Sequence, residues 1–309
     1  MSMKHLPIMA GLWLASVAGA QAFSLDDSLT LPEPSNIASS TCKPVDPAKA
    51  VMQPVTLHKS FADDFHQLDR NVLGTDVGTG WRGYYMHSDR RNMDSHTLSG
   101  NKEKELYVYP SYSAAQKDPL GLDPFQITEN GLEITASRIA PQNKAALYNF
   151  DYTSGLLQSR YLHTQKFGYF EVKAKIPTGK AMWPAFWLLN TKNDWPPEID
   201  VLEVFDGNEA HKITTTTHWK NPSDKSHVMS YCSYEVKNST TDFNLYGVLW
   251  NKDNITYYLN RQPVVQIQTP PGLTESMYML LNLAVGQQSD ATSPDKAIFP
   301  VGWVAAYEY

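Results

Sequence analysis

The stretch that most constrains this chain is residues 195–207, which place three carboxylates on what reads as a single β-strand. Two prolines precede Glu198 and an Asp-Gly pair ends the stretch, as is typical of strand boundaries. Side chains at positions i and i+2 of a strand share a face, so Glu198 and Asp200 point the same way while Ile199 points into a core. The chain must therefore build a sheet here with one acidic and one apolar face.

The third acid, Glu203, is out of phase with the first two. Strict alternation would place Leu202 in the acidic row and turn Glu203 toward the core. A β-bulge at Val201 and Leu202 would absorb one residue and return Glu203, and then Phe205, to the acidic face. We therefore predict a bulged strand whose three carboxylates share one open face.

Three acids in a row are electrostatically costly, because like charges raise one another's pKa. A glycosidase uses such an arrangement, since it needs an ionised carboxylate beside a protonated carboxylic acid. Retaining enzymes hold this pair about 5–5.5 Å apart. The alternative is a solvated strand face that happens to be acidic. The tryptophans on either side of the three acids favour the catalytic interpretation.

The segment from Glu198 to Glu203 resembles the bulged E-x-D-x-x-E signature of glycoside hydrolase family 16, retaining endo-β-glycanases on a β-jelly roll. The resemblance covers roughly residues 57–309. Further segments that resemble the family are Phe61–Phe65, Ser95–Tyr109, Phe167–Glu171, Trp183–Leu189 and Asn282–Gly286.

The resemblance implies a role for each acid. Glu198 would be the nucleophile, Glu203 the general acid and then base, and Asp200 the assisting carboxylate between them. The charge of Asp200 would raise the pKa of Glu203 and keep its proton near neutral pH. We expect the carboxyl groups of Glu198 and Glu203 to lie about 5–6 Å apart, the range for a retaining enzyme.

Six further residues are candidates for contact with sugar. Indole rings offer flat apolar faces to sugar rings, although tryptophan also packs in cores. A lone histidine is more often structural than functional, but here it lies in a His-Trp pair that resembles a family strand beside the acids. The candidates are Trp183, Trp187, Trp195, Asn101, Glu105 and His218.

The rest of the chain predicts an all-β protein. Many short strands alternate in polarity and are separated by turn signals, such as the hairpin expected at Asn130-Gly131, and no helix-length amphipathic segment is convincing. This pattern indicates an antiparallel β-sandwich of jelly-roll type with the acids on a concave face. We expect Phe170, Val172, Ile199 and Val204 behind the acids in the core.

The N-terminal region divides into two parts. Residues 1–22 read as a signal peptide with a short basic start, an apolar run and a small-x-small cleavage site, which predicts a secreted protein, periplasmic or extracellular, with no membrane contact after cleavage. Residues 23–56 are rich in proline and serine and are interpreted as an extended arm. Residues 57–309 would form the catalytic domain.

The two cysteines of the chain, Cys42 and Cys232, leave two interpretations open. In an oxidising compartment they could form a disulfide that ties the arm to the body. They could equally be two thiols that never meet.

Composition excludes several classes of function. The net charge of −6 provides no basic patch for nucleic acid. No His/Asp cluster has metal-ligand spacing and no G-x-S-x-G elbow is present, which disfavours a metal-dependent or serine hydrolase. We expect a monomer that needs no cofactor. Many family members carry a calcium-binding Asp on the last strand, but Val304 stands at that position, so structural calcium is doubtful.

Two alternatives share this sequence pattern. A transglycosylase would use the same acids with a sugar as acceptor, and a carbohydrate-binding jelly roll would not hydrolyse at all. The retention of Glu198 and Glu203 argues against the binding protein. The glycan stays open among β-1,3-glucan, β-1,3-1,4-glucan, agar, carrageenan and bacterial exopolysaccharide, with a preference for the β-glucans and exopolysaccharide.

Overall fold

The computed structural model describes residues 25–35 and 51–309. The predicted signal peptide and Cys42 lie outside this part of the chain. Cys232, its expected partner, is a buried residue of strand β12 (His227–Glu235), and the disulfide stays a prediction.

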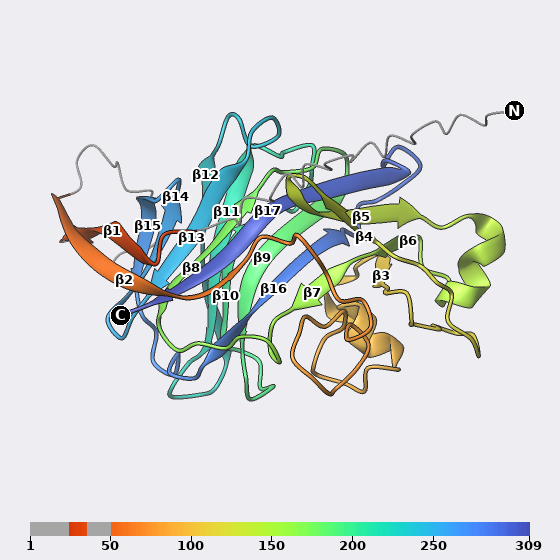
Figure 1. Cartoon of the computed structure of the whole chain (residues 1–309), viewed down its shortest axis with the longest axis horizontal. Coiled ribbons are helices and arrows are strands. Elements are labelled where there is room, and N and C mark those ends of the chain that lie inside the picture. Colours follow the sequence, from red (N-terminus) through yellow and green to blue (C-terminus); the bar gives the residue numbers. More distant parts are fainter. Residues whose placement is uncertain (1–24, 36–50) are drawn as a thin grey trace, which may run out of the picture.

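Two β-sheets packed face to face form the body, as the alternation of the sequence predicts (Figure 1). The larger sheet runs in the order β15-β14-β13-β8-β17-β5-β6-β3, with β2 on β17, β1 on β2 and β4 on β5. All of its pairings are antiparallel except that of β3 with β6. Its strands are β1 (Ser28–Ser35), β2 (Val51–Asp63), β3 (Glu105–Tyr107), β4 (Phe125–Thr128), β5 (Gly131–Arg138), β6 (Tyr152–Ser154), β8 (Gly168–Ala174), β13 (Asn244–Trp250), β14 (Asn254–Leu259), β15 (Gln262–Gln268) and β17 (Lys296–Glu308).

The smaller sheet carries the acidic strand near its centre, in the order β12-β11-β10-β9-β16-β7. All of its pairings are antiparallel. Its remaining strands are β7 (Leu156–Gln158), β9 (Met182–Asn190), β10 (Glu198–Glu203), β11 (Lys212–Lys220) and β16 (Met277–Val285). The antiparallel β-sandwich predicted from the sequence is confirmed.

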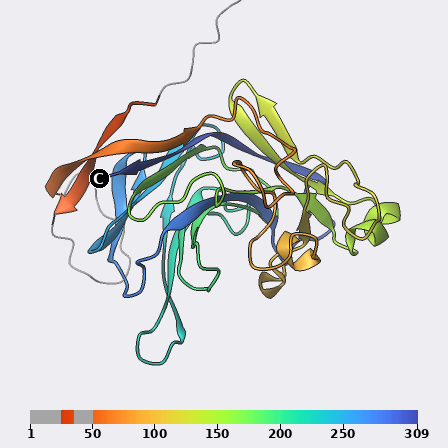
Figure 2. The ribbon, with the colours of Figure 1, turned by 60° about the horizontal axis from the view of Figure 1, so that its bottom comes forward.

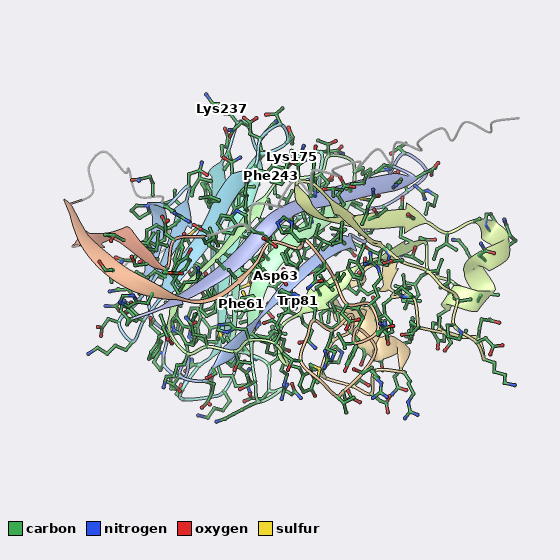
Figure 3. All side chains as sticks on the ribbon, viewed as in Figure 1. Phe61, Asp63, Trp81, Lys175, Lys237 and Phe243 are labelled. Carbon is green, nitrogen blue, oxygen red and sulfur yellow. The ribbon has the colours of Figure 1, made fainter. Side chains whose placement is uncertain are left out.

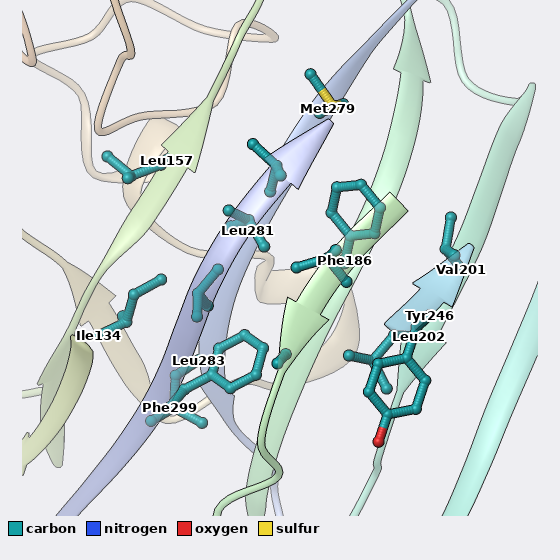
Figure 4. Packing of buried hydrophobic residues seen from close by; sticks show 14 of the residues in the cluster. Ile134, Leu157, Phe186, Val201, Leu202, Tyr246, Met279, Leu281, Leu283 and Phe299 are labelled. Atoms are coloured by element: carbon teal, nitrogen blue, oxygen red, sulfur yellow. The ribbon is translucent and has the colours of Figure 1, made fainter. Parts of the chain in front are cut away.

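One continuous apolar core fills the space between the sheets (Figure 4). Alternate residues of facing strands point into it, and Phe170, Val172, Ile199 and Val204 are all buried there, as expected. The hairpin at Asn130-Gly131 also forms, between β4 and β5. The core therefore supports the inner face of the acidic strand with rigid packing.

The outer face of the larger sheet differs from the expectation of a half-buried sheet. Leu29, Leu31 and Leu57 pack there in a second apolar cluster, together with Tyr169 of β8. Glu171, on the same face, is fully buried and pairs with Arg261, whose Nη2 lies 3.0 Å from the carboxylate. The predicted boundary at residues 56 and 57 falls inside β2, so the described part of the arm belongs to the sheet (Figure 2).

In the described ranges, helical structure is limited to three short 3₁₀ helices, η1 (Met93–His96), η2 (Ser99–Asn101) and η3 (Pro141–Leu147). None of the helices described is long and apolar enough to cross a membrane.

The position at which the family resemblance would place a calcium-binding Asp is occupied by an apolar residue, Val304. Val304 is fully buried and pairs with Asp63 of β2. The Asp63 carboxylate already accepts the backbone N–H of Phe65 at 2.8 Å and the indole N–H of Trp81 at 2.8 Å (Figure 3). The Val304 side chain supplies no oxygen, so it cannot replace the Asp ligand that the family resemblance associates with this position.

Candidate active site

Strand β10 contains the predicted bulge. Glu198 and Asp200 lie opposite Leu189 and Trp187 of β9, but Leu202 lies opposite Phe186, so β10 has one residue more than its partner. The pairing with β11 shifts in the same interval. The extra residue returns Glu203 to the face of Glu198 and Asp200. Val201 and Leu202 are both buried in the core (Figure 4).

The acidic face opens into a cleft of about 1090 Å³. Glu198 and Glu203 line it, together with Asn101, Trp183, Trp187, Trp195 and His218. A smaller hollow of about 50 Å³ adjoins the cleft, and Asp200 and Glu103 line it with the other two acids. The structure therefore brings together all predicted site residues except Glu105.

Glu105 does not line either cavity. Strand β3 is buried on both faces, so the Glu105 side chain is fully enclosed and accepts the backbone N–H of Val285 at 2.6 Å. Burial and the nearby charge of Glu103 raise its pKa well above the usual range. The acid that faces the hollow is Glu103, held by the Asn101 amide at 3.0 Å.

Each tryptophan touches the site differently. The Trp195 indole is half exposed and donates to Glu198 Oε2 at 2.9 Å. Trp183 donates to Glu203 Oε1 at 3.2 Å. Trp187 is only 7% exposed and donates to Asn282 Oδ1 at 2.7 Å, so it forms the floor of the cleft.

The three acids are strongly coupled. Burial is the largest cause that raises the pKa of each, and the charge of Asp200 adds to it at Glu198. Burial raises the pKa of Glu203 to about 7, and the Trp183 N–H keeps it from rising further. The charges of Asp200 and Glu203 raise each other's pKa, as the sequence suggests, and the charge of Glu103 adds to the effect at Glu203.

Carboxylate oxygens of Glu198 and Asp200 lie within 4.8 Å of each other, so a full negative charge on both is costly. Glu198 accepts the Trp195 N–H, whereas Asp200 Oδ2 is buried without a hydrogen-bond partner. Glu198 Oε1 also lies 3.6 Å from His218 Nε2. Burial raises the pKa of Glu198, whereas His218 and the Trp195 N–H lower it and so favour the ionised form that a nucleophile needs.

His218 lies opposite Glu198 on β11 and reaches two acids. Its Nε2 is 3.2 Å from Asp200 Oδ2, and its Nδ1 is 2.8 Å from His227 Nε2. Glu198, Asp200 and His218 thus bring three potential metal ligands within 4.8 Å of one another. Spacing along the chain does not reveal this group, because His218 is a cross-strand neighbour of the acids.

The sequence also missed the contribution of β12. His227, Met229 and Tyr231 alternate along this strand and line the cleft, and the β11–β12 hairpin extends beyond the rest of the sheet (Figure 2). Their period-two spacing was a usable signal. Without the pairing of β12 with β11, however, the sequence does not show on which side of the sandwich they lie.

Comparisons with known proteins agree with this class of site. The family model described as glycosyl hydrolases family 16 matches residues 121–294. Two endo-1,3-1,4-beta-glycanases of Rhizobium meliloti (strain 1021), EglC and ExsH, are 34% and 32% identical over 232 and 230 residues. Each alignment covers 74% of this chain and 46% of the relative, so the chain spans about half the length of these curated relatives.

The laminarinase catalytic domain from Thermotoga maritima MSB8 has the same fold, with a TM-score of 0.61 at 20% identity. The match covers 82% of this chain and 98% of that domain. The fold and the family model together define the class of protein, a jelly roll of the glycoside hydrolase type. The chain belongs to glycosyl hydrolases family 16.

Proposed function

We propose that this protein is an exported endo-β-glycanase that cleaves internal bonds of a neutral β-1,3- or β-1,3-1,4-linked glucan with retention. The observation that carries the proposal is the bulged strand β10, which places Glu198 and Glu203 in the cleft and Asp200 in the hollow that adjoins it. The two Rhizobium meliloti glycanases named above support the linkage. Export rests on the leader sequence at residues 1–22.

The mechanism requires an ionised Glu198 and a protonated Glu203. Ionised Glu198 attacks the anomeric carbon while Glu203 gives its proton to the leaving oxygen, and a covalent glycosyl-enzyme results. Glu203, now a carboxylate, then removes a proton from the water that releases the sugar. Trp183 and Thr216 orient Glu203 through donors at 3.2 and 3.3 Å.

The lining of the cleft favours a neutral glycan. The described residues that line the cleft include no lysine or arginine. They include four acids, Asp94, Asp194, Glu198 and Glu203. An acidic cleft repels a polyanion and leaves aromatic faces as the main attraction for sugar rings. The lining also extends from residues 85–101 to β12, which suits a chain lying across the sheet.

A reducing-sugar assay over a panel of polysaccharides tests the function. We expect activity on β-1,3-glucan and β-1,3-1,4-glucan and no activity on sulfated carrageenan. An endo-acting enzyme should release a range of oligosaccharides from the first minutes. Release of single sugars from chain ends would contradict endo action. Products longer than the supplied oligosaccharides would assign the protein to transglycosylation instead.

The pKa of Glu203 sets the alkaline limit of the reaction. The general acid must be protonated, so we expect kcat/KM to fall as pH rises through about 7, where Glu203 loses its proton. Trp183→Phe removes an N–H that lowers this pKa but keeps an aromatic face. The alkaline limb should therefore move to higher pH in the variant, and an unchanged limb would contradict the assignment of Glu203.

A further inference from the structure

The geometry of His218 and its two acidic neighbours matches that of a metal site. Zinc binds histidine nitrogen and carboxylate oxygen at about 2.0–2.2 Å, so neighbouring ligand atoms of a tetrahedral site lie about 3.4 Å apart. His218 Nε2 lies 3.2 Å from Asp200 Oδ2 and 3.6 Å from Glu198 Oε1. All three ligand atoms lie within 4.8 Å of one another, so small side-chain movements would close the set.

An independent observation points into the same space. Asp200 is only 3% exposed, and its buried Oδ2 makes no hydrogen bond although His218 Nε2 lies 3.2 Å away. A buried carboxylate oxygen without a hydrogen bond calls for an explanation. A cation between Asp200, Glu198 and His218 would satisfy this atom.

His227 supplies the outer contact that metal-binding histidines usually have. A histidine that binds metal through Nε2 must carry its proton on Nδ1 and donate it to an acceptor, which fixes the orientation of the ring. His218 Nδ1 lies 2.8 Å from His227 Nε2, and the two rings stack 5.1 Å apart. This contact leaves His218 Nε2 free to bind on the acid side.

The ligand chemistry selects the kind of ion. Imidazole nitrogen and carboxylate oxygen are both ligands that Zn²⁺ accepts, and three protein ligands with an open fourth position are typical of its catalytic sites. Calcium needs six to eight oxygen ligands and does not suit a set of three with a nitrogen. The cleft provides the open fourth position, since Glu198 and His218 both line it.

We propose that Glu198, Asp200 and His218 form a binding site for a divalent transition-metal ion of the zinc type, and that metal and glycan exclude each other. The metal would take Oε1 of Glu198, the carboxylate that attacks the sugar. Metal binding would therefore switch the cleft off, and a chelator would restore it. The site would make the hydrolase sensitive to free transition metal in its surroundings.

Calorimetric titration of the metal-free protein with zinc chloride, in a buffer that does not chelate, tests the site without relying on activity. We expect one zinc per chain. His218→Ala should weaken binding on the order of 100-fold and His227→Ala about 10–100-fold. His87→Ala is the matched control, because His87 lines the same cleft away from the cluster and its loss should leave zinc affinity unchanged.

Exclusion is tested with Glu203→Gln, which keeps all three ligands. Zinc should weaken the binding of a laminari-oligosaccharide to this variant, and addition of a chelator should reverse the effect. Zinc binding that survives His218→Ala, or that is lost with His87→Ala, would overturn the site. Simultaneous binding of zinc and oligosaccharide would overturn exclusion. If the polysaccharide panel finds no substrate but zinc binds as expected, the proposed function fails alone.

Discussion

Glu203→Gln and Glu198→Gln each lower kcat/KM for polysaccharide by on the order of 10²–10⁴ or more, while the protein stays folded. Glutamine cannot give a proton to the leaving oxygen at position 203, nor attack the anomeric carbon at position 198. A 10⁴-fold loss corresponds to about 5.4 kcal/mol of transition-state stabilisation. The fold should survive, because both side chains line the cleft and an amide replaces a carboxyl of similar shape. Initial rates on soluble β-glucan, with circular dichroism, measure both effects.

The stereochemistry of chemical rescue separates the two roles. With an activated aryl glycoside, azide should rescue Glu198→Gly by direct displacement and give the α-azide. The same azide should rescue Glu203→Gly by attacking the glycosyl-enzyme and give the β-azide. Asp200→Asn serves as the comparison and should lose less activity, since it neither attacks nor protonates the sugar. Full activity of either glutamine variant on polysaccharide would end this mechanism.

Trp187→Ala lowers the free energy of unfolding by about 3–5 kcal/mol. The indole of Trp187 is only 7% exposed and forms the cleft floor, where it packs near Tyr85 with ring centres 6.0 Å apart. Its N–H donates to Asn282 Oδ1. The Nδ2 group of Asn282 in turn donates to the Tyr107 hydroxyl at 2.9 Å. Removal leaves a cavity and an unpaired buried amide. Urea denaturation followed by fluorescence measures the loss.

Trp195→Ala is the matched control, because this indole is 52% exposed. Its removal should change the free energy of unfolding by less than about 1 kcal/mol. It should instead raise KM, since a sugar-stacking face and a donor to Glu198 disappear. Equal destabilisation by the two substitutions would show that the burial of Trp187 is not the reason for its effect.

Much of the fold could be predicted because the alternation of strands is local information. The period-two pattern of β8 and the phase error between Asp200 and Glu203 define a bulged strand over a core without reference to distant residues. The covering of the outer face could not be predicted in this way. Leu29 and Leu31 lie in a proline-rich stretch, and their burial depends on pairing with β2 and packing near Tyr169.

Part of the site could likewise be predicted from the sequence, and part could not. The three acids and the tryptophans follow from strand parity and from family resemblance. That Glu103 rather than Glu105 faces the hollow does not follow from either, because β3 is buried on both faces and shows no alternation. The contact of His218 with His227 joins two strands whose relative register only the pairing of β11 and β12 defines.

The central claim is that Glu198 forms a covalent bond to the sugar during hydrolysis. A 2-deoxy-2-fluoro glycoside of a β-glucan oligosaccharide with an activated leaving group slows the release of this intermediate, and mass spectrometry of the intact and digested protein then locates the label. The account predicts one glycosyl group per chain, on the peptide that contains Glu198, and no label in Glu198→Gln. Rapid turnover with an inverted product, or a label on Glu203, would contradict it.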